Sequence, residues 1–287
     1  MSTVSVIIPV YNRDKIISET LELLTKQNYR PLEIIIIDDA STDNTIELIN
    51  LFIKNNLDKK LNIIFHSNKS NLGACYCRNY GIFLSTGKYI QFLDSDDSLS
   101  PEKISTQVKI LEDKKKQIAI SDYIYVRDGE VIKKCKNNGN LFKKISYGWS
   151  IFTSAPLFRS SLIKNQIKWN EKLLMLQDKD FIFRAIMLSG EYDYVPGYTS
   201  YYNQHSFIQI SDSYSIKTPQ FFTMLNSRIF FLFSNIFKMR TFCIFYTLIG
   251  IIEIFFQLII YHLKKSIKIL FGEKFFKKLK KFYNSKK

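Results

Sequence analysis

The sequence predicts an α/β protein, with a mainly parallel central sheet covered by helices on both faces and a helical extension at the C-terminal end. Short apolar runs of strand length alternate with stretches of helical periodicity through residues 1–100, which is typical of a doubly wound sheet. After Pro219 the composition changes to Phe, Ile and Leu and then to a Lys-rich end. A chain of 287 residues has room for one catalytic-size domain and such an appendage.

Strand and helix repeat along the first half of the chain. Val4 to Val10 is an apolar, β-branched run, and Asp14 to Asn28 then carries apolar side chains at helical spacing before Pro31. The next apolar run, Leu32 to Ile37, is continuous, as expected for a strand buried on both faces. The other elements expected in this half are strands at 61–65 and 88–93 and helices at 44–54 and 73–84.

The second half of the catalytic region has a less regular pattern. Ser100-Pro101-Glu102 is typical of the N-cap, N1 and N2 positions of a helix. Beyond that helix, an apolar run at 118–126, the Asp128-Gly129 turn and a second run from Val131 predict a hairpin.

The positive charge of the chain is concentrated at its C-terminal end. The net charge is +15, but residues 264–287 hold ten Lys against one Glu and so account for +9 of it. Because the rest of the chain is only mildly basic, we expect no nucleic-acid partner. A hydrophobic content of 46% with 15% aromatic residues excludes a disordered chain.

The cysteines and the first residues favour a cytoplasmic protein. The four Cys lack both the paired spacing of a zinc site and the density of a secreted disulfide scaffold, so Cys75 and Cys77 are expected to serve packing. The opening MSTVSVIIPVYNRDK has no basic segment before its apolar run. We therefore expect a core strand there and no signal peptide.

Polar residues follow several of the expected strands, at the edge where such sheets bind ligands. They include three carboxylates within four positions, at Asp94, Asp96 and Asp97. In an extended segment, Asp94 and Asp96 project to the same side and can share one ligand. Carboxylate oxygens suit Mg²⁺ or Mn²⁺, which commonly bind through one or two carboxylates plus phosphate oxygens. The alternative is a solvated acidic turn before the next helix.

Five segments together point to a known family. They are VSVIIPVYN from Val4, EIIIIDDASTDNT from Glu33, NLGACYCRN from Asn71, FLDSDD from Phe92 and QDKDFIFR from Gln177. In this order they resemble a family 2 glycosyltransferase with the GT-A fold, a Rossmann-like sheet, of the type that builds bacterial capsule or O-antigen.

The resemblance implies a UDP-sugar donor. Val10 and Tyr11 would hold the uracil ring, and Asp39 would accept its N3–H, a chemically reasonable role for a carboxylate. Arg78 would contact the diphosphate or steady the metal-binding aspartates, because a guanidinium suits either anion. The alternatives are that Asp38 and Asp39 cap the following helix and that Arg78 lies on a helix surface.

The resemblance also implies a divalent metal, Mn²⁺ or Mg²⁺. Asp96 would ligate it, Asp94 would meet the ribose or the metal, and Asp97 would hold the loop. The metal would act as a Lewis acid on the departing nucleoside diphosphate. His205 would reach the metal or a phosphate, with a structural histidine as the alternative, and Asn203 stands where the family commonly has Arg.

An inverting transfer needs a general base for the acceptor hydroxyl, and a carboxylate suffices. The family supplies it from a Glu-Asp pair followed by an apolar stretch and an Arg. Here Gln177 replaces the Glu, so Asp178 is the expected base. Asp180 is the alternative base, and both acids could instead be solvated helix residues.

The C-terminal residues predict contact with a membrane. A mixed apolar and aromatic stretch followed by Lys is typical of an amphipathic segment on an anionic surface. Two alternatives remain. The segment 241–263 is long enough to span a bilayer, although Glu253, Gln257 and His262 interrupt it. The helices could also pack on the catalytic domain or on a second copy of the chain, giving a homodimer.

The expected organisation is a catalytic domain at 1–218, with a nucleotide-sugar half at 1–100 and an acceptor half at 101–218, and a membrane-associating extension at 219–287. The expected function is inverting, metal-dependent transfer of a sugar from a UDP-sugar to a hydroxyl of a growing, lipid-linked saccharide. The protein would be cytoplasmic and peripheral at the inner face of the plasma membrane. The alternatives are a sugar-phosphate nucleotidyltransferase, for which the loop after the first strand lacks glycine, and a non-catalytic basic membrane-binding protein.

Overall fold

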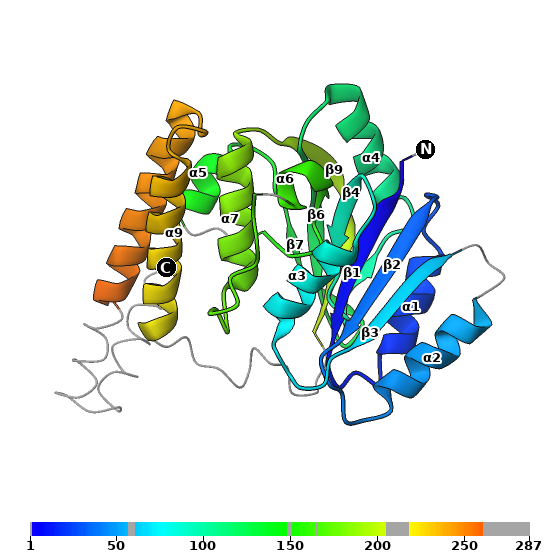
Figure 1. Cartoon of the computed structure of the whole chain (residues 1–287). Coiled ribbons are helices and arrows are strands. Elements are labelled where there is room, and N and C mark those ends of the chain that lie inside the picture. The colour runs from blue at the N-terminus through cyan, green and yellow to red at the C-terminus, as the bar shows by residue number, and fades with distance from the viewer. Residues whose placement is uncertain (1, 57–60, 148–150, 165, 205–217, 261–287) are drawn as a thin grey trace.

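The computed structural model describes residues 2–56, 61–147, 151–164, 166–204 and 218–260 (Figure 1). Its strands are β1 (Val4–Val10), β2 (Leu32–Asp38), β3 (Asn62–Ser67), β4 (Tyr89–Phe92), β5 (Ser98–Leu99), β6 (Ile118–Arg127), β7 (Glu130–Cys135), β8 (Pro156–Arg159) and β9 (Asp193–Gln204). They form one sheet in the order β3-β2-β1-β4-β8-β6-β9-β5, with β7 paired to β6.

Helices cover both faces of this sheet, as the alternation of elements predicts. Their bounds are α1 (Ile17–Thr25), α2 (Thr45–Asn55), α3 (Ala74–Leu84), α4 (Lys103–Lys114), α5 (Leu141–Ser146), α6 (Ser160–Lys164), α7 (Gln177–Ser189) and α9 (Thr218–Asn235). A last described helix, here called the C-terminal helix, runs over Thr241–Ile260.

The first four core strands are parallel and explain the continuous apolar runs. β1 pairs in parallel with β2 and β4, and β2 pairs in parallel with β3. Every residue of β1 and β2 is buried. Alternate side chains face opposite layers: Ile7 and Ile35 belong to the core under α3 and α7, whereas Val6 and Ile34 belong to the core under α1, α2 and α4. The predicted α/β fold is confirmed.

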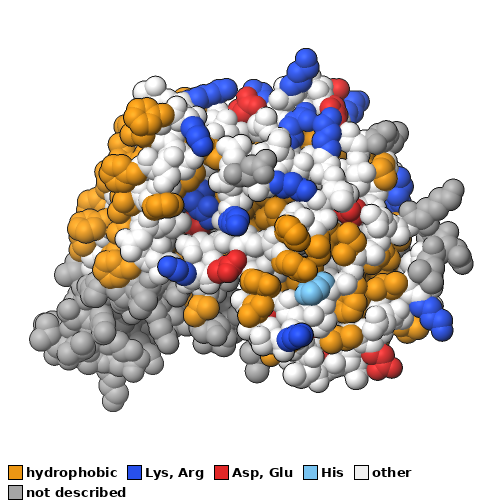
Figure 2. Space-filling view, viewed as in Figure 1, with side chains coloured by type: hydrophobic (Ala, Val, Ile, Leu, Met, Phe, Trp, Pro, Cys, Tyr) orange, Lys and Arg blue, Asp and Glu red, His pale blue; other side chains and the backbone are white. Residues whose placement is uncertain are grey.

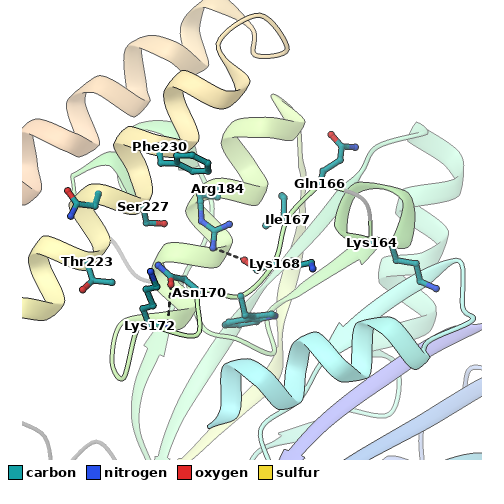
Figure 3. Close-up of a pocket in the computed structure, with 12 residues that line it drawn as sticks. Lys164, Gln166, Ile167, Lys168, Asn170, Lys172, Arg184, Thr223, Ser227 and Phe230 are labelled. Carbon is teal, nitrogen blue, oxygen red and sulfur yellow. Dashed lines mark hydrogen bonds between the residues drawn. The ribbon is translucent and has the colours of Figure 1, made fainter. Parts of the chain in front are cut away.

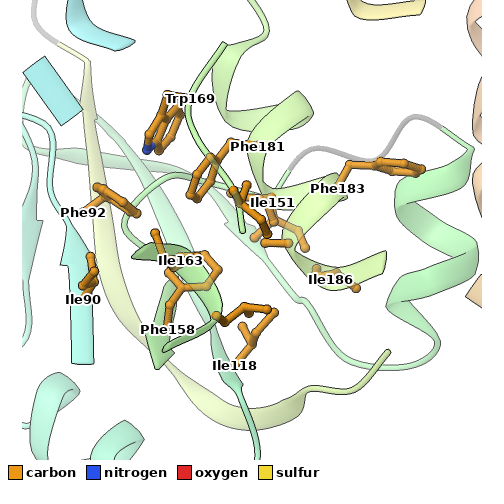
Figure 4. Close-up of a cluster of buried hydrophobic side chains, with 14 of the residues drawn as sticks. Ile90, Phe92, Ile118, Ile151, Phe158, Ile163, Trp169, Phe181, Phe183 and Ile186 are labelled. Atoms are coloured by element: carbon orange, nitrogen blue, oxygen red, sulfur yellow. The ribbon is translucent and has the colours of Figure 1, made fainter. Parts of the chain in front are cut away.

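The second half of the sheet is mixed. β8 runs antiparallel to both β4 and β6, and β6 runs parallel to β9. The predicted hairpin at Asp128-Gly129 is confirmed as β6 and β7. Beside β4 and β8 an aromatic cluster fills the core (Figure 4), in which Phe92 and Phe158 meet Phe181 edge-on with centroids 5.4 and 5.9 Å from it.

The predicted start of the helix after the acidic segment is wrong. α4 begins at Lys103 with Glu102 as its N-cap, two residues after the expected position. The reason is a long-range strand pairing. β5 pairs antiparallel with β9, and the backbone N–H of Ser100 donates to the Thr199 carbonyl at 3.0 Å, so the chain stays extended where an isolated sequence would start a helix.

The predicted helical extension is confirmed for its described part. α9 and the C-terminal helix lie beside α7, on the opposite side of the molecule from α1 and α2 (Figure 1). Arg228 of α9 is 1% exposed, with its Cζ 3.7 Å from the centroid of the Phe183 ring on α7. Its Nη1 donates to the Gly250 carbonyl of the C-terminal helix at 3.0 Å. One buried side chain therefore joins three helices.

Candidate active site

The loops after β1 and β2 are held together where these neighbouring strands end. The backbone N–H of Asn12 donates to Ser41 Oγ at 2.9 Å, and the backbone N–H of Thr42 donates to Asn12 Oδ1 at 2.8 Å. Val10, at the end of β1, is buried, and Tyr11 after it is partly exposed. The residues expected to contact the nucleotide base, Val10 and Tyr11, thus lie at this edge of the sheet.

Asp39 holds the loop between β3 and α3. Its Oδ1 accepts hydrogen bonds from Asn68 Nδ2 at 2.9 Å and from the backbone N–H of Leu72 at 2.8 Å. Its Oδ2 accepts from the backbone N–H of Gly73 at 2.8 Å. Gly73 has φ of 90°, a conformation that favours glycine. Asp39 is therefore a structural clamp at this edge.

Asp38 is also held by nearby donors. It is fully buried, and its Oδ2 accepts from the backbone N–H of Ser41 at 3.1 Å and from Ser67 Oγ at 2.8 Å. Because α2 begins at Thr45 with Asn44 as its N-cap, neither Asp38 nor Asp39 caps that helix. The two acids join loops and do not themselves cap the helix.

Arg78 connects the acidic segment to α7. Its Nη2 donates to Asp94 Oδ1 at 2.7 Å and its Nη1 donates to Gln177 Oε1 at 3.0 Å. Arg78 is 6% exposed, so the alternative that it is a helix-surface residue is wrong. The side chain that replaces the family's Glu, Gln177, accepts this hydrogen bond as a neutral amide. Arg78 and Gln177, which are 99 positions apart in the sequence, are thus in direct contact.

Trp169, which the sequence analysis did not single out, supports Arg78 from behind. The Arg78 Cζ lies 4.4 Å from the centroid of the Trp169 ring. The same ring is stacked on Phe181, with centroids 4.1 Å apart and planes inclined by 4°. A cation over an indole face is a favourable electrostatic contact. Arg78 is therefore oriented by two hydrogen bonds and by an aromatic surface.

The acidic segment is a turn, not the extended segment that was predicted. The backbone N–H of Asp97 donates to the Asp94 carbonyl at 3.1 Å. Asp94 pairs with Arg78, whereas Asp96 Oδ2 lies 3.6 Å from Arg13 Nη2. The turn directs the two carboxylates to different arginines, which an extended chain with both acids on one side would not do.

The acidic turn carries ligands suited to a divalent cation. The side chains of Asp94 and Asp96 are 25% and 20% exposed. Two accessible carboxylates fit Mg²⁺ or Mn²⁺ that shares its coordination with phosphates and water. Within the described part of the chain, no group of three or more His, Cys, Asp or Glu side chains is arranged to hold a metal. His205 lies outside the described residues.

Asp97 lies behind this turn. It is 1% exposed, and its Oδ1 accepts from the backbone N–H of Asn203 at 3.2 Å. Burial, followed by the charges of Asp96 and Asp94, raises the pKa of Asp97 well above its ordinary value. Asn203, where the family commonly has Arg, also donates through Nδ2 to the Asp96 carbonyl at 3.2 Å. Asp97 and Asn203 thus fasten the turn to β9.

The two candidate bases at the start of α7 have different surroundings. Asp178 is partly exposed, and burial first and the charge of Asp94 next raise its pKa, opposed by a backbone hydrogen bond. Asp180 is 0% exposed, and its Oδ2 accepts from Arg184 Nε at 2.9 Å and Nη2 at 2.7 Å. Asp180 forms a buried ion pair, so the alternative that it is the base, or a solvated acid, is wrong.

Two tyrosines that were missed in the sequence pair with each other across β6 and β9. Tyr125 of β6 and Tyr202 of β9 are partners in the strand register, with ring centroids 4.4 Å apart. Burial raises the pKa of Tyr125, with lesser contributions from acidic neighbours that include Asp178 and Asp97. Alternate tyrosines in SDYIYVR were the available signal.

The cysteines are buried side chains. All four are free and buried. Burial raises the pKa of Cys75 to about 12, which leaves the thiol protonated at neutral pH. The expectation that Cys75 and Cys77 serve packing agrees with their place in the main hydrophobic core.

Known proteins resemble this chain in sequence and in fold. The profile of glycosyl transferase family 2 matches residues 5–184. The chain is 35% identical over 120 residues to glycosyltransferase GlyG of Streptococcus pneumoniae, covering 42% of this chain and 38% of GlyG. It is 39% identical over 128 residues to Escherichia coli WfaP, a UDP-Glc:α-D-GlcNAc-diphosphoundecaprenol β-1,3-glucosyltransferase, covering 45% of this chain and 49% of WfaP. The matches thus span less than half of these relatives.

The fold has a similar counterpart among solved structures. Staphylococcus aureus TarS 1–349, in complex with UDP-GlcNAc, superimposes with a TM-score of 0.67 and 23% identity, covering 80% of this chain and 66% of that one. This likeness supports the GT-A fold. The family profile covers more than half of the chain, and the chain therefore belongs to glycosyl transferase family 2.

Proposed function

We propose that this family 2 glycosyltransferase is an inverting, metal-dependent enzyme that moves a sugar from a UDP-sugar to a hydroxyl of a growing, lipid-linked surface polysaccharide. The observation that carries the proposal is the Arg78 bridge, whose hydrogen bonds of 2.7 Å to Asp94 and 3.0 Å to Gln177 join the acidic turn to the helix that bears Asp178. A metal-binding turn and a general base at one edge are what sugar transfer requires.

The donor site would lie over the ends of β1 and β2. Val10 and Tyr11 would contact the uracil ring, and Asp39 would accept its N3–H. Asp39 Oδ2 accepts a hydrogen bond from the backbone N–H of Gly73, and a carboxylate oxygen has two lone pairs. The Asp39 carboxylate could therefore hold the loop between β3 and α3 and accept a hydrogen bond from the uracil ring at the same time. The UDP-Glc in the description of WfaP and the UDP-GlcNAc bound to TarS support a uridine donor.

The metal site would be the acidic turn. Asp96 and Asp94 would hold Mn²⁺ or Mg²⁺, with His205 as a further ligand. A bound cation would supply Lewis acidity and neutralise the departing diphosphate. Arg13 and Arg78 already lie against these two carboxylates. Both guanidiniums would also lie near the charge that develops on the diphosphate, where they favour its departure.

Asp178 would be the general base. Its carboxylate would accept the proton of the acceptor hydroxyl while that oxygen attacks the anomeric carbon from the face opposite the diphosphate, which inverts the configuration. Its raised pKa makes Asp178 a stronger proton acceptor than an ordinary aspartate. The paired Tyr125 and Tyr202 rings would provide a surface for the acceptor sugar, since tyrosine combines an apolar face with a polar hydroxyl.

The two last described helices would attach the enzyme to the cytoplasmic face of the membrane. Apolar side chains gather over them at the left edge of Figure 2. We call this surface the apolar helix face; its most exposed aromatic residues are Phe230, Phe233, Phe237, Phe245, Phe255 and Phe256. Monomeric soluble proteins rarely expose such a contiguous surface without a partner.

Peripheral attachment is favoured over a spanning helix or a dimer interface. The C-terminal helix is long and apolar enough to cross a membrane, with a mean hydropathy of 2.3, and 28% of its most apolar segment is buried in the protein. Arg228 fastens it to α9 and α7, which a separate spanning helix would not need. The Lys-rich sequence that follows would meet anionic headgroups.

The donor assignment is tested with a panel of UDP-sugars and Mn²⁺, by measuring UDP released without acceptor. We expect release from one sugar nucleotide and its loss on chelation of the metal. Failure of every UDP-sugar to bind or turn over would refute the assignment. Release of diphosphate from UTP and a sugar phosphate would instead favour a nucleotidyltransferase.

A further inference from the structure

A cavity of about 680 Å³ lies between α9 and the chain before α7, at residues 164 and 166–172 (Figure 3). Three elements form its wall: the segment before α7, Arg184 within α7, and one face of α9. The α9 residues are Thr223, Asn226, Ser227 and Phe230, at the i, i+3, i+4 and i+7 positions that share a helix face. The proposed transfer reaction does not use this cavity.

The lining of the cavity is basic. Lys164, Lys168, Lys172 and Arg184 contribute to it, and none of its described lining residues is Asp or Glu. Arg184 is balanced by Asp180, at 2.7 Å, and Lys164 donates to the Ser85 carbonyl. Lys168 and Lys172 are exposed at the cavity. These two ammonium groups leave an excess of positive charge that suits a phosphate.

Neutral hydrogen-bonding groups complete the polar part of the cavity. Asn170 lies on the segment before α7, and Asn226 and Ser227 face it from α9. Figure 3 shows the Arg184 guanidinium extending between Ser227 and the 167–168 backbone, where its Nη2 donates to the Lys168 carbonyl at 2.9 Å. Amide and hydroxyl groups beside two lysines can bind several oxygens of one phosphate group.

One rim of the cavity is apolar and continuous with the apolar helix face. Phe230 lines the cavity and is 75% exposed. A ligand with an anionic head could therefore place its head among the lysines and its apolar chain along Phe230. Trp169 also lines the cavity, and its ring lies 4.4 Å from the Arg78 Cζ. One side chain thus contacts both the cavity and Arg78.

We propose that this cavity binds the phosphate head of a lipid whose chain runs along α9 beside Phe230. Two membrane components have this chemistry, an anionic phospholipid and the diphosphate of a lipid-linked acceptor. The biological role of the cavity rests on the proposed function, but its binding chemistry does not. If the acceptor is the ligand, the cavity holds the diphosphate while the sugar reaches the acidic edge.

The test uses the full-length protein and vesicles of phosphatidylcholine, alone or with phosphatidylglycerol or a polyprenyl diphosphate. The double variant Lys168→Gln/Lys172→Gln is compared with Lys133→Gln/Lys136→Gln, which removes the same charge from exposed positions on and after β7. We expect the first variant to bind its preferred vesicle about tenfold more weakly than the second, since each lysine near an anionic surface contributes appreciably.

The vesicle composition identifies the source of the phosphate. A loss confined to polyprenyl diphosphate identifies the lipid-linked acceptor, and a loss confined to phosphatidylglycerol identifies bulk phospholipid. Loss with both means that the cavity recognises the phosphate alone. Equal behaviour of the two double variants overturns the proposal. Soluble polyphosphate that protects the cavity as well as the lipids do also overturns it, because the ligand would then be a polyanion.

The lipid chain is tested separately with Phe230→Ser. This variant should weaken binding of a long-chain polyprenyl diphosphate about tenfold and leave inorganic diphosphate binding unchanged. Phe83→Ser, at a 78% exposed phenylalanine on α3, is the matched control. An equal effect of Phe230→Ser on inorganic diphosphate, or no effect on either ligand, would overturn the role of the chain.

Failure of this inference can be distinguished from failure of the proposed function. The lysine double variant should release UDP from the donor without acceptor at the wild-type rate. If the acceptor is the ligand, its KM should rise in this variant while kcat stays close to wild type; if phospholipid is the ligand, neither should change. If the wild-type protein releases no UDP, the proposed function fails, and the vesicle experiment still decides whether the cavity binds lipid phosphate.

Discussion

The acidic edge of the sheet and the pair of C-terminal helices present different surfaces. At the edge, Asp39 accepts three hydrogen bonds and Arg78 donates to two partners. On the helices, the polar Arg228 is buried at the junction, while several phenylalanines face outward. The edge is preorganised for a polar ligand, whereas the outer surface of the helices is suited to an apolar environment.

The largest expected effect comes from removing the proposed base. Asp178→Asn keeps the size of the side chain but cannot take a proton, so kcat should fall by about 10² to 10⁴, the usual contribution of a general base. Steady-state transfer and thermal unfolding are measured together. A variant that keeps wild-type kcat would show that the edge uses another base.

Asp180, two residues along the same helix, should affect folding instead. Asp180→Asn leaves Arg184 buried without its counter-charge, and breaking such a pair costs about 3 kcal/mol or more. Urea denaturation measures the free energy of unfolding. If Asp180→Asn lost less than about 1 kcal/mol, the ion pair would not be a main support of α7.

The junction of the helices is tested with Gly250→Ala. A Cβ there would lie 2.5 Å from Arg228 Nη1 and 3.0 Å from a Phe183 ring carbon. Overpacking costs about 1 to 3 kcal/mol, partly offset by the better helix propensity of Ala. Thermal unfolding should show destabilisation that becomes smaller in an Arg228→Met background, where only the contact with the Phe183 ring remains. Destabilisation of the same size in that background would contradict the contact with Arg228.

The outer surface of the helices is tested with Phe233→Ser/Phe237→Ser. Both side chains are exposed, at 74% and 101%, so the unfolding free energy should change little. Binding to anionic vesicles should weaken about tenfold, since each buried Phe contributes on the order of 1 kcal/mol or more. Unchanged vesicle binding would show that the lysine-rich end alone provides the attachment.

The smallest effect is a shift in pH dependence. Burial raises the pKa of Asp178, so its ionised form, the active base, is lost at a higher pH than for an ordinary aspartate. The acid limb of kcat/KM should therefore lie at a higher pH than an ordinary aspartate would give, with activity falling as the pH falls through the raised pKa. An acid limb that remains unchanged in Asp178→Asn would assign it to another group.

The sequence was sufficient for most of the fold because the deciding signals are local. β1 matches its predicted range, and the ends of β2 and α2 differ from prediction by one residue. These apolar runs are buried on both faces, so the core requires the pattern. The start of α4 could not be predicted from local residues, because β5 pairs with β9 about 100 residues later along the chain.

The candidate site was only partly predictable for the same reason. Asp94, Asp96 and Arg78 were found from their segments, but their partners were not. Arg13 and Gln177 reach them only through the folded sheet. Trp169 has no neighbouring motif, and its role appears only when Arg78 and Phe181 lie against its two faces. Segment patterns identify chemical groups, while the fold decides which groups meet.

The Arg78 bridge also has a thermodynamic consequence. One guanidinium supports Asp94 in the acidic turn and Gln177 at the start of the helix that carries Asp178. A nucleotide-bound metal that coordinates Asp94 would weaken the hydrogen bond from Arg78 to Asp94. The hydrogen bond from Arg78 to Gln177, at the start of α7, would change as a result. We expect donor and acceptor affinities to be coupled, and such coupling is reciprocal: each ligand must change the affinity of the other by the same factor.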